Sequence, residues 1–310
     1  MENSAVLGMH GDDPVISVSH LQMRYGDKQV LDGLDLTVEA EEVVALLGPN
    51  GAGKSTTVEI LEGFRAPSGG QVSVLGTDPA HGDDAWRSRL GVVLQSSNDH
   101  AKWRPRQLLS HIAEFYRPYA DPWPVDELLE LVGLTEQANQ KLSTLSGGQR
   151  RRLDVALGVV GRPPLLFLDE PTTGFDPHAR RDFHDLVHRL GDMQGTTILL
   201  TTHDLAEAEK LASRILILAG GRIIADGSPP MLTRAVSRTS EVRWMQDGQQ
   251  HLHVSENATE FVRDLLTRDG ESVSELEISR ATLEDAYLSI VEQFEAGEAV
   301  RSAQFQEVAP

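Results

Sequence analysis

A glycine-rich stretch near residue 50 constrains the fold of this chain more than any other segment. An apolar run of strand length, Val43–Leu47, precedes it, and a stretch of helical character through about Gly63 follows it. Glycines let the backbone turn so that successive N–H groups point at one anion, and the start of a helix adds partial positive charge. The strand, loop and helix fit the phosphate-binding pattern G-x-x-x-x-G-K-[ST] in the run Gly48-Pro49-Asn50-Gly51-Ala52-Gly53-Lys54-Ser55-Thr56.

Two side chains of this loop carry specific chemistry. Lys54 is expected to reach the β- and γ-phosphates of a nucleoside triphosphate, and the Ser55 hydroxyl is expected to ligate Mg²⁺. A chance glycine turn beside a lysine is the alternative. The position of the motif between a strand and a helix argues against that alternative. We therefore interpret the loop as a nucleotide-binding site that also holds Mg²⁺.

Composition excludes several classes of protein. A formal net charge of −19 over 310 residues disfavours a nucleic-acid partner, because phosphate backbones are bound by basic surfaces. The absence of cysteine excludes disulfides and thiolate metal sites. No run reaches the ~20 apolar residues of a membrane helix, and the polar N-terminus is unlike a signal peptide. If the protein works at a membrane, we expect another chain to span it.

The order of apolar patterns predicts an α/β protein with an appended domain. We expect a disordered arm over 1–14, a nucleotide-binding domain over 15–227 and a small α+β domain over 228–296, followed by a tail over 297–310. Within the larger domain, helical spacing over about 98–160 predicts a helical insertion. A length of 310 residues allows one large and one small domain.

A second stretch, like the phosphate loop, places glycines at the start of a helix. Leu145–Gln149 places a serine and two glycines immediately before a helical stretch, Arg150–Val160. Such a helix start is suited to an anion, although an ordinary helix cap at a glycine turn is the simpler interpretation. The residues concerned are Ser146, Gly147, Gly148 and Gln149.

Two adjacent carboxylates end a buried strand. Leu165–Leu168 is apolar, and Asp169 and Glu170 follow directly. In nucleotide hydrolases the first such carboxylate supports Mg²⁺ and the second polarises a water molecule. Two acids at a surface strand end are the alternative, which the upstream phosphate loop disfavours.

Four further residues give weaker signals. Gln95 ends one predicted strand and His203 follows another, at the edge where α/β sheets place ligand contacts. A solvated glutamine and an ordinary loop histidine are the simpler interpretations. Asp176 opens a loop and is equally suited to cap the helix after it. Tyr25 stands at a turn upstream of the phosphate loop, where adenine stacking and an ordinary strand end are equally compatible with the spacing.

Taken together, the segment from about Val15 to Asp226 resembles the ATP-binding subunit of an ABC transporter. The resemblance implies a P-loop NTPase core of ABC ATPase type with a helical subdomain and a small C-terminal α+β domain. It rests on motifs in matching order: Gly48–Thr56 as Walker A, Gln95 as the Q-loop, Leu145–Gln149 as the signature LSGGQ, Leu165–Glu170 as Walker B with its catalytic glutamate, Asp176 as the D-loop, His203 as the switch histidine and Tyr25 as the adenine-stacking aromatic.

The C-terminal part narrows the resemblance. Thr282–Leu288 looks like the tail of daunorubicin-type drug-resistance ATPases, which serve ABC-2 exporters with a separate transmembrane permease subunit. The resemblance implies a peripheral protein at the cytoplasmic face of the membrane. Phe175 stands where the family usually has leucine, and Glu41 stands where a turn glycine is common.

The chain offers two helix starts that could bind an anion, at Lys54 and at Ser146, whereas one triphosphate needs only one. A head-to-tail homodimer formed with ATP resolves this, because the Ser146 site of one subunit closes over the nucleotide of the other. The family resemblance implies the same arrangement. We expect Glu170, His203 and Lys54 to act in hydrolysis, and Ser55, Asp169 and Gln95 to support Mg²⁺.

Two rival functions are distinguishable. A soluble ABC ATPase of translation or repair would carry two ATPase halves or a long coiled coil between the Walker motifs, and this sequence has neither. A regulator that uses nucleotide only as a structural ligand would not need Glu170 and His203. We therefore favour an ATP-hydrolysing exporter subunit.

Overall fold

The computed structural model describes residues 13–94, 101–236, 240–246, 249–255, 257–270, 272–280 and 282–296. The expected tail over 297–310, most of the expected arm over 1–14, and Gln95 lie outside the described residues. The chain divides into two compact units, 1–223 and 224–310. This division falls within a strand, a few residues before the boundary expected after 227.

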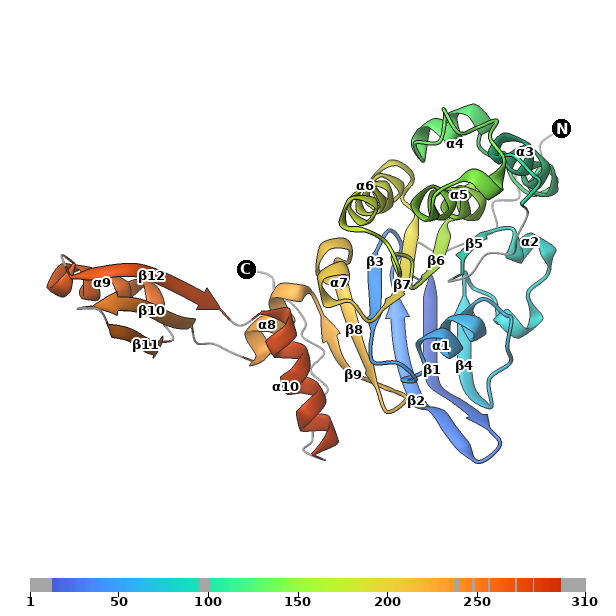
Figure 1. Ribbon diagram of the computed structural model, residues 1–310. Helices are drawn as coiled ribbons and strands as arrows, with labels where there is room; N and C mark the ends of the chain where they lie inside the picture. The colour runs from blue at the N-terminus through green and yellow to red at the C-terminus, as the bar shows by residue number, and fades with distance from the viewer. Residues whose placement is uncertain are drawn as a thin grey trace. The chain divides into compact units, whose positions relative to one another are not determined.

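A six-stranded sheet forms the centre of the first unit (Figure 1), with the strand order β5-β6-β7-β3-β8-β9. The pairs β5–β6, β6–β7, β7–β3 and β3–β8 are parallel. Strands such as β6 are apolar almost throughout and buried, as expected where both faces of a parallel sheet are covered. The strands are β3 (Val43–Leu47), β5 (Leu90–Val93), β6 (Leu165–Asp169), β7 (Thr197–Thr202), β8 (Arg214–Ala219) and β9 (Arg222–Gly227).

A smaller antiparallel sheet packs on the same core. Its strand order is β2-β1-β4, with β1 over Ile16–Tyr25, β2 over Lys28–Val38 and β4 over Gly69–Val74. One hydrophobic cluster unites residues of both sheets and of helix α1 (Lys54–Leu61), including Ile16, Leu46, Val58, Leu61 and Phe167. Helix α1 is therefore anchored by its apolar face, which fixes the loop at its start.

The segment expected to form a helical insertion does contain three helices. They are α3 (Pro105–Tyr116), α4 (Val125–Leu131) and α5 (Gly147–Val159), and Figure 1 shows them gathered on one side of the main sheet. The buried positions Leu108, Leu109, Leu128 and Leu129 follow helical spacing. The remaining helical elements of this unit are 3₁₀ turns at Pro79–His81 and Leu142–Thr144, α2 (Asp84–Arg87), α6 (Pro177–Gln194) and α7 (Leu205–Leu211).

The second unit contains a three-stranded antiparallel sheet of order β11-β10-β12. Helix α9 packs on one face of this sheet around Val242, Trp244 and Leu265. A helix that the sequence analysis did not predict, α8, begins with two prolines, which favour a turn but are tolerated in the first turn of a helix. The elements are α8 (Pro229–Val236), β10 (Ser240–Gln246), β11 (Gln249–Ser255), α9 (Ala258–Asp269), β12 (Val273–Arg280) and α10 (Leu283–Glu295).

The two departures from the family pattern have local explanations. Glu41 adopts φ +66°, the left-handed conformation that favours glycine, and its N–H donates to Thr197 Oγ1 at 2.9 Å. The ring of Phe175 packs edge-on against Phe183, with the ring centres 5.9 Å apart. The turn at Glu41 thus keeps its glycine-like geometry without a glycine.

The carboxyl group of Glu62, at the end of α1, is expected to make the folded protein less stable at alkaline pH. Glu62 Oε1 is buried without a hydrogen-bond partner among the described residues, and burial, reinforced by Asp169 and Glu59, raises the pKa of Glu62 to about 8. A carboxyl whose pKa is raised on folding favours the folded state at low pH, and that contribution is lost as the pH rises toward 8. We therefore expect Glu62→Gln to raise the thermal unfolding midpoint at pH 8.5 by several degrees, and by less at pH 5.5. The exposed control Glu136→Gln should change little at either pH, and an equal gain at both pH values for Glu62→Gln would contradict this account.

Candidate functional site

The phosphate loop lies between β3 and α1, as predicted. Gly51 and Gly53 adopt φ +82° and +111°, a backbone region that glycine enters without strain. A Cβ on Gly53 would lie 2.6 Å from Leu31 Cδ2, and one on Gly48 would collide with the carbonyl oxygen of Leu218. The glycines are therefore required both by the turn of the loop and by its close packing on neighbouring strands.

Lys54 extends along its own loop. Its Nζ donates to the carbonyl oxygens of Gly48, at 2.7 Å, and Pro49, at 3.2 Å, and lies 3.8 Å from Glu170 Oε1. Burial lowers the pKa of Lys54, and the charges of Glu170 and Asp169 oppose that shift. The side chain, only 5% exposed, thus holds a cation between the phosphate loop and the two carboxylates.

Two hydroxyl groups, one from α1 and one from β7, approach the carboxylate at the end of β6. Ser55 Oγ lies 3.5 Å from Asp169 Oδ1, and Thr201 Oγ1 donates a short hydrogen bond to the same oxygen. Parallel pairing places Asp169 opposite Thr201, so the carboxyl ends of β6 and β7 share one edge with the phosphate loop. Paired hard oxygens of this kind are ligands that Mg²⁺ accepts.

Glu170 and His203 form the next layer of the site. His203 Nδ1 lies 3.3 Å from Glu170 Oε1, and Thr173 Oγ1 donates to Glu170 Oε2 at 3.4 Å. The backbone of Glu170 adopts φ +43°, and its N–H donates to the carbonyl and hydroxyl oxygens of Thr201, both at 3.1 Å. The Glu170 side chain is 16% exposed and that of His203 is 51% exposed, so the carboxylate faces partly inward and the imidazole faces outward.

The signature segment forms a helix cap. Ser146 Oγ accepts from the N–H of Gln149 at 3.2 Å, and Gln149 Oε1 accepts from the N–H of Ser146 at 2.9 Å, which is a complete capping box. A Cβ added to Gly147 would meet no atom within 4 Å, whereas one on Gly148 would lie 3.1 Å from Ala179 Cβ. Within the subunit, Ser146 therefore acts as the cap that the simpler interpretation predicted, and Gly147 borders open space.

Three weaker candidates lie at element ends. Asp176 caps α6 by accepting from the N–H groups of His178 and Ala179, at 2.8 and 2.9 Å, and these bonds hold its pKa below the usual range. Tyr25 ends β1 and is 41% exposed, and the guanidinium carbon of Arg65 lies 5.1 Å from the centre of its ring. Gln95, outside the described residues, keeps only its sequence-based assignment.

Sequence reasoning missed two residues that support the site. Thr201 bonds both Asp169 and the Glu170 backbone, and a threonine at the end of a strand beside an Asp-Glu pair was a usable signal. Arg151, buried in α5, donates to the Asp169 carbonyl at 3.1 Å, and no motif in the sequence identified it.

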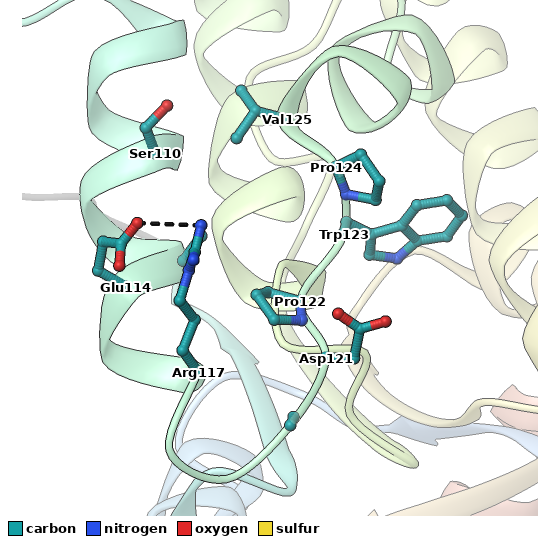
Figure 2. Close-up of a pocket in the computed structure, with 10 residues that line it drawn as sticks. Ser110, Glu114, Arg117, Asp121, Pro122, Trp123, Pro124 and Val125 are labelled. Carbon is teal, nitrogen blue, oxygen red and sulfur yellow. Dashed lines mark ion pairs between the residues drawn. The ribbon is translucent and has the colours of Figure 1, made fainter.

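A pocket of about 640 Å³ lies elsewhere, between α3 and the segment leading into α4 (Figure 2). Arg117 and Glu114 pair at 3.2 Å on the α3 side, and the ring of Trp123 on the other side points away from α3. Arg162 stacks over that ring at 4.4 Å. No predicted site residue lines this pocket, so we assign it no part in nucleotide chemistry.

Comparison with known proteins identifies the family. A family profile described as ABC transporter matches residues 31–173. The Nod factor export ATP-binding protein I of Rhizobium meliloti (strain 1021) is 42% identical over 221 residues, 70% of this chain and 65% of that protein. The daunorubicin resistance ATP-binding protein DrrA3 of Streptomyces coeruleorubidus is 42% identical over 218 residues, 70% of this chain and 69% of the relative. The chain belongs to the ABC transporter ATP-binding family.

Solved structures of ABC cassettes have the same fold. An ATP-binding subunit of an ABC transporter superposes with a TM-score of 0.61 at 27% identity, covering 71% of this chain and 92% of the other. A bacterial ABC transporter cassette solved as a dimer gives a TM-score of 0.60 at 25% identity, covering 69% of this chain and 98% of the other. The predicted P-loop NTPase fold of ABC type is confirmed. Within the described part of this ABC chain, every helix is too short or too polar to cross a bilayer.

The loop geometry predicts that Gly53→Ala lowers both the stability of this ABC cassette and its binding of ATP. A Cβ at φ +111° and 2.6 Å from Leu31 Cδ2 combines backbone strain with overpacking, so we expect a loss of roughly 1–3 kcal/mol in urea unfolding. We also expect the variant to lose the thermal stabilisation that ATP gives the wild type. Gly26→Ala is the control, because Gly26 has φ +59° with open space around it and lies outside the loop. An ATP response in Gly53→Ala equal to that of the control would contradict the assignment.

Proposed function

We propose that this chain binds and hydrolyses ATP with Mg²⁺ and drives an ABC-2 type exporter through a separate membrane subunit. The observation that carries the proposal is the gathering of Lys54, Asp169, Glu170 and His203 at one edge of a parallel sheet. The names of the two relatives, one in Nod factor export and one in daunorubicin resistance, support export as the purpose of the hydrolysis.

The phosphate loop and its neighbours fit a Mg²⁺-bound triphosphate. The first amides of α1 lack partners inside the helix, and together with Lys54 they offer positive charge to phosphate oxygens. Ser55 and Asp169 would hold Mg²⁺, which adds charge that neutralises the phosphates. By family resemblance, Gln95 also supports the metal, Tyr25 stacks on the adenine ring and Asp176 faces the nucleotide across the dimer.

Glu170 is the proposed general base, and His203 lies beside its carboxylate. Glu170 would orient the attacking water and accept its proton, and His203, 3.3 Å away, would hold both that carboxylate and the γ-phosphate in place. Lys54 would counter the charge that develops on the phosphate oxygens. Loss of a general base of this kind lowers kcat by about 10²–10⁴-fold.

The signature end of α5 completes the site in a second copy. The N-terminus of α5 begins at Ser146, and the space beside Gly147 is open. The free amides there would bind the γ-phosphate of a nucleotide held by a partner subunit. An isologous head-to-tail dimer then contains two nucleotides between two subunits. The solved dimer of a bacterial ABC transporter cassette supports this arrangement. ATP provides charge that both surfaces contact, so hydrolysis would release the closed dimer.

The proposed place of work is the cytoplasmic face of the membrane, with a drug-like or other amphipathic cargo carried by the separate permease. A soluble ABC ATPase without a transport role is the rival. The two are distinguished by whether a neighbouring open reading frame encodes a protein with several apolar runs of ~20 residues, and by whether that protein co-purifies with this chain. Stimulation of ATP hydrolysis by that membrane subunit supports export, and its failure to bind favours the rival.

The dimer hypothesis predicts the behaviour of Glu170→Gln. The variant should bind ATP normally, hydrolyse it at least about 100-fold more slowly, and remain dimeric with ATP longer than the wild type, because the bridging phosphate is not removed. Analytical ultracentrifugation with and without Mg²⁺ and ATP measures the association. Monomers in every condition would argue against a shared site.

Complementary variants test whether each pocket is built from two subunits. Lys54→Ala should lose ATP binding, whereas Ser146→Arg should keep it and lose turnover. In an equal mixture, one heterodimer pocket combines the intact Lys54 with the intact Ser146, so part of the ATPase activity should return. Absence of any recovery in a mixture shown by ultracentrifugation to associate would rule out the two-subunit pocket.

A further inference from the structure

A buried arginine behind the catalytic carboxylates has no part in the mechanism above. Arg151 lies in the second turn of α5, the helix capped by Ser146, and is 7% exposed. Its guanidinium donates to three main-chain carbonyls: Nε to Pro171 at 2.9 Å, Nη2 to Asp169 at 3.1 Å, and Nη1 to Leu94 through a short bond. A single side chain thus joins α5 to the ends of β5 and β6.

Two of these carbonyls flank Glu170. The Asp169 carbonyl precedes the glutamate and the Pro171 carbonyl follows it. Glu170 itself has φ +43°, a conformation uncommon for any residue but glycine and held only where the surroundings enforce it. Thr201 holds the Glu170 N–H from the side of β7, so the glutamate backbone is fixed from β7 on one side and from α5 on the other.

The chemistry of arginine suits this position. A guanidinium presents donors in a fixed planar fork and keeps its charge, whereas an ammonium is one point with rotatable donors. Burial lowers the pKa of Arg151, and the carboxylates of Asp154, Asp169 and Glu207 offset that effect. The cation is therefore placed among acidic groups, with its N–H groups directed at the backbone that carries Glu170.

We propose that Arg151 is a positioning residue for Glu170 and links the signature helix to the catalytic edge of the same subunit. The inference rests on the proposed ATP hydrolysis. Arg151 acts through the backbone around Glu170, while the loop residues that hold the phosphates remain unchanged. Its loss should therefore lower turnover and spare ATP affinity.

The test compares Arg151→Met and Arg151→Lys with the wild-type full-length chain in Mg²⁺-ATP. We expect Arg151→Met to lower kcat at least tenfold with KM within about threefold, and Arg151→Lys to recover part of the rate. Arg214→Met is the matched control. Arg214 is partly buried and, like Arg151, donates to a carbonyl, that of Thr37 at 3.2 Å, but it begins β8 at the sheet end opposite the nucleotide loop. Its loss should lower the unfolding midpoint comparably and leave kcat within about twofold.

A second measurement separates a role at Glu170 from damage to α5. Arg151→Met added to Glu170→Gln should preserve the ATP-dependent dimer in ultracentrifugation, because the Ser146 cap is untouched. If Arg151→Met does not fold, the kcat and KM of Arg151→Lys decide. Unchanged kcat, or equal losses in kcat and ATP affinity, or loss of the dimer in the double variant, would overturn the inference. A wild type without ATPase activity would overturn the proposed function as well, whereas an active wild type with an indifferent Arg151 would overturn this inference alone.

Discussion

Parallel pairing of β3, β6 and β7 is the constraint on which the site depends. The register sets Leu47 opposite Thr202 and Asp169 opposite Thr201, so the phosphate loop, the carboxylates and His203 all emerge at one edge. Ser55 in the phosphate loop lies 114 positions before Asp169, and His203 lies 33 positions after Glu170, so only the buried apolar strands bring them together. The hydrophobic core thus determines which polar side chains meet.

Much of this arrangement was predictable because local signals agreed with one another. The apolar strands, the glycine pattern around Gly53 and the Asp169–Glu170 pair each indicated the same fold class. The apolar runs Val43–Leu47 and Leu165–Leu168 match β3 and β6 to within one residue. Prediction failed where local signals conflicted with context. Helix α8 begins with Pro229 and Pro230, a pair that gives no helix signal in the sequence, and the contacts of Arg151 depend on three carbonyls that no sequence pattern encodes.

In the proposed dimer, Ser146 would serve a local and an intermolecular role at once. Ser146 satisfies the backbone of α5 through Gln149, and this bond fixes the first turn of the helix. Once that turn is rigid, the remaining amides and the bare surface of Gly147 are free to meet a phosphate from outside. The two interpretations that sequence alone left open are therefore compatible, since the cap prepares the surface that a second subunit would use.

The backbone conformation of Glu170 has a consequence for how this ATPase rests between cycles. A left-handed torsion in a non-glycine residue costs on the order of 1–2 kcal/mol, far less than separating two strands of the sheet. A small displacement of α5 or β7 would therefore let the Glu170 backbone relax, and with it move the carboxylate from its proposed catalytic position, while the core stays packed. Returning to the strained torsion would cost only the energy of that one residue, and no strand of the sheet would have to separate.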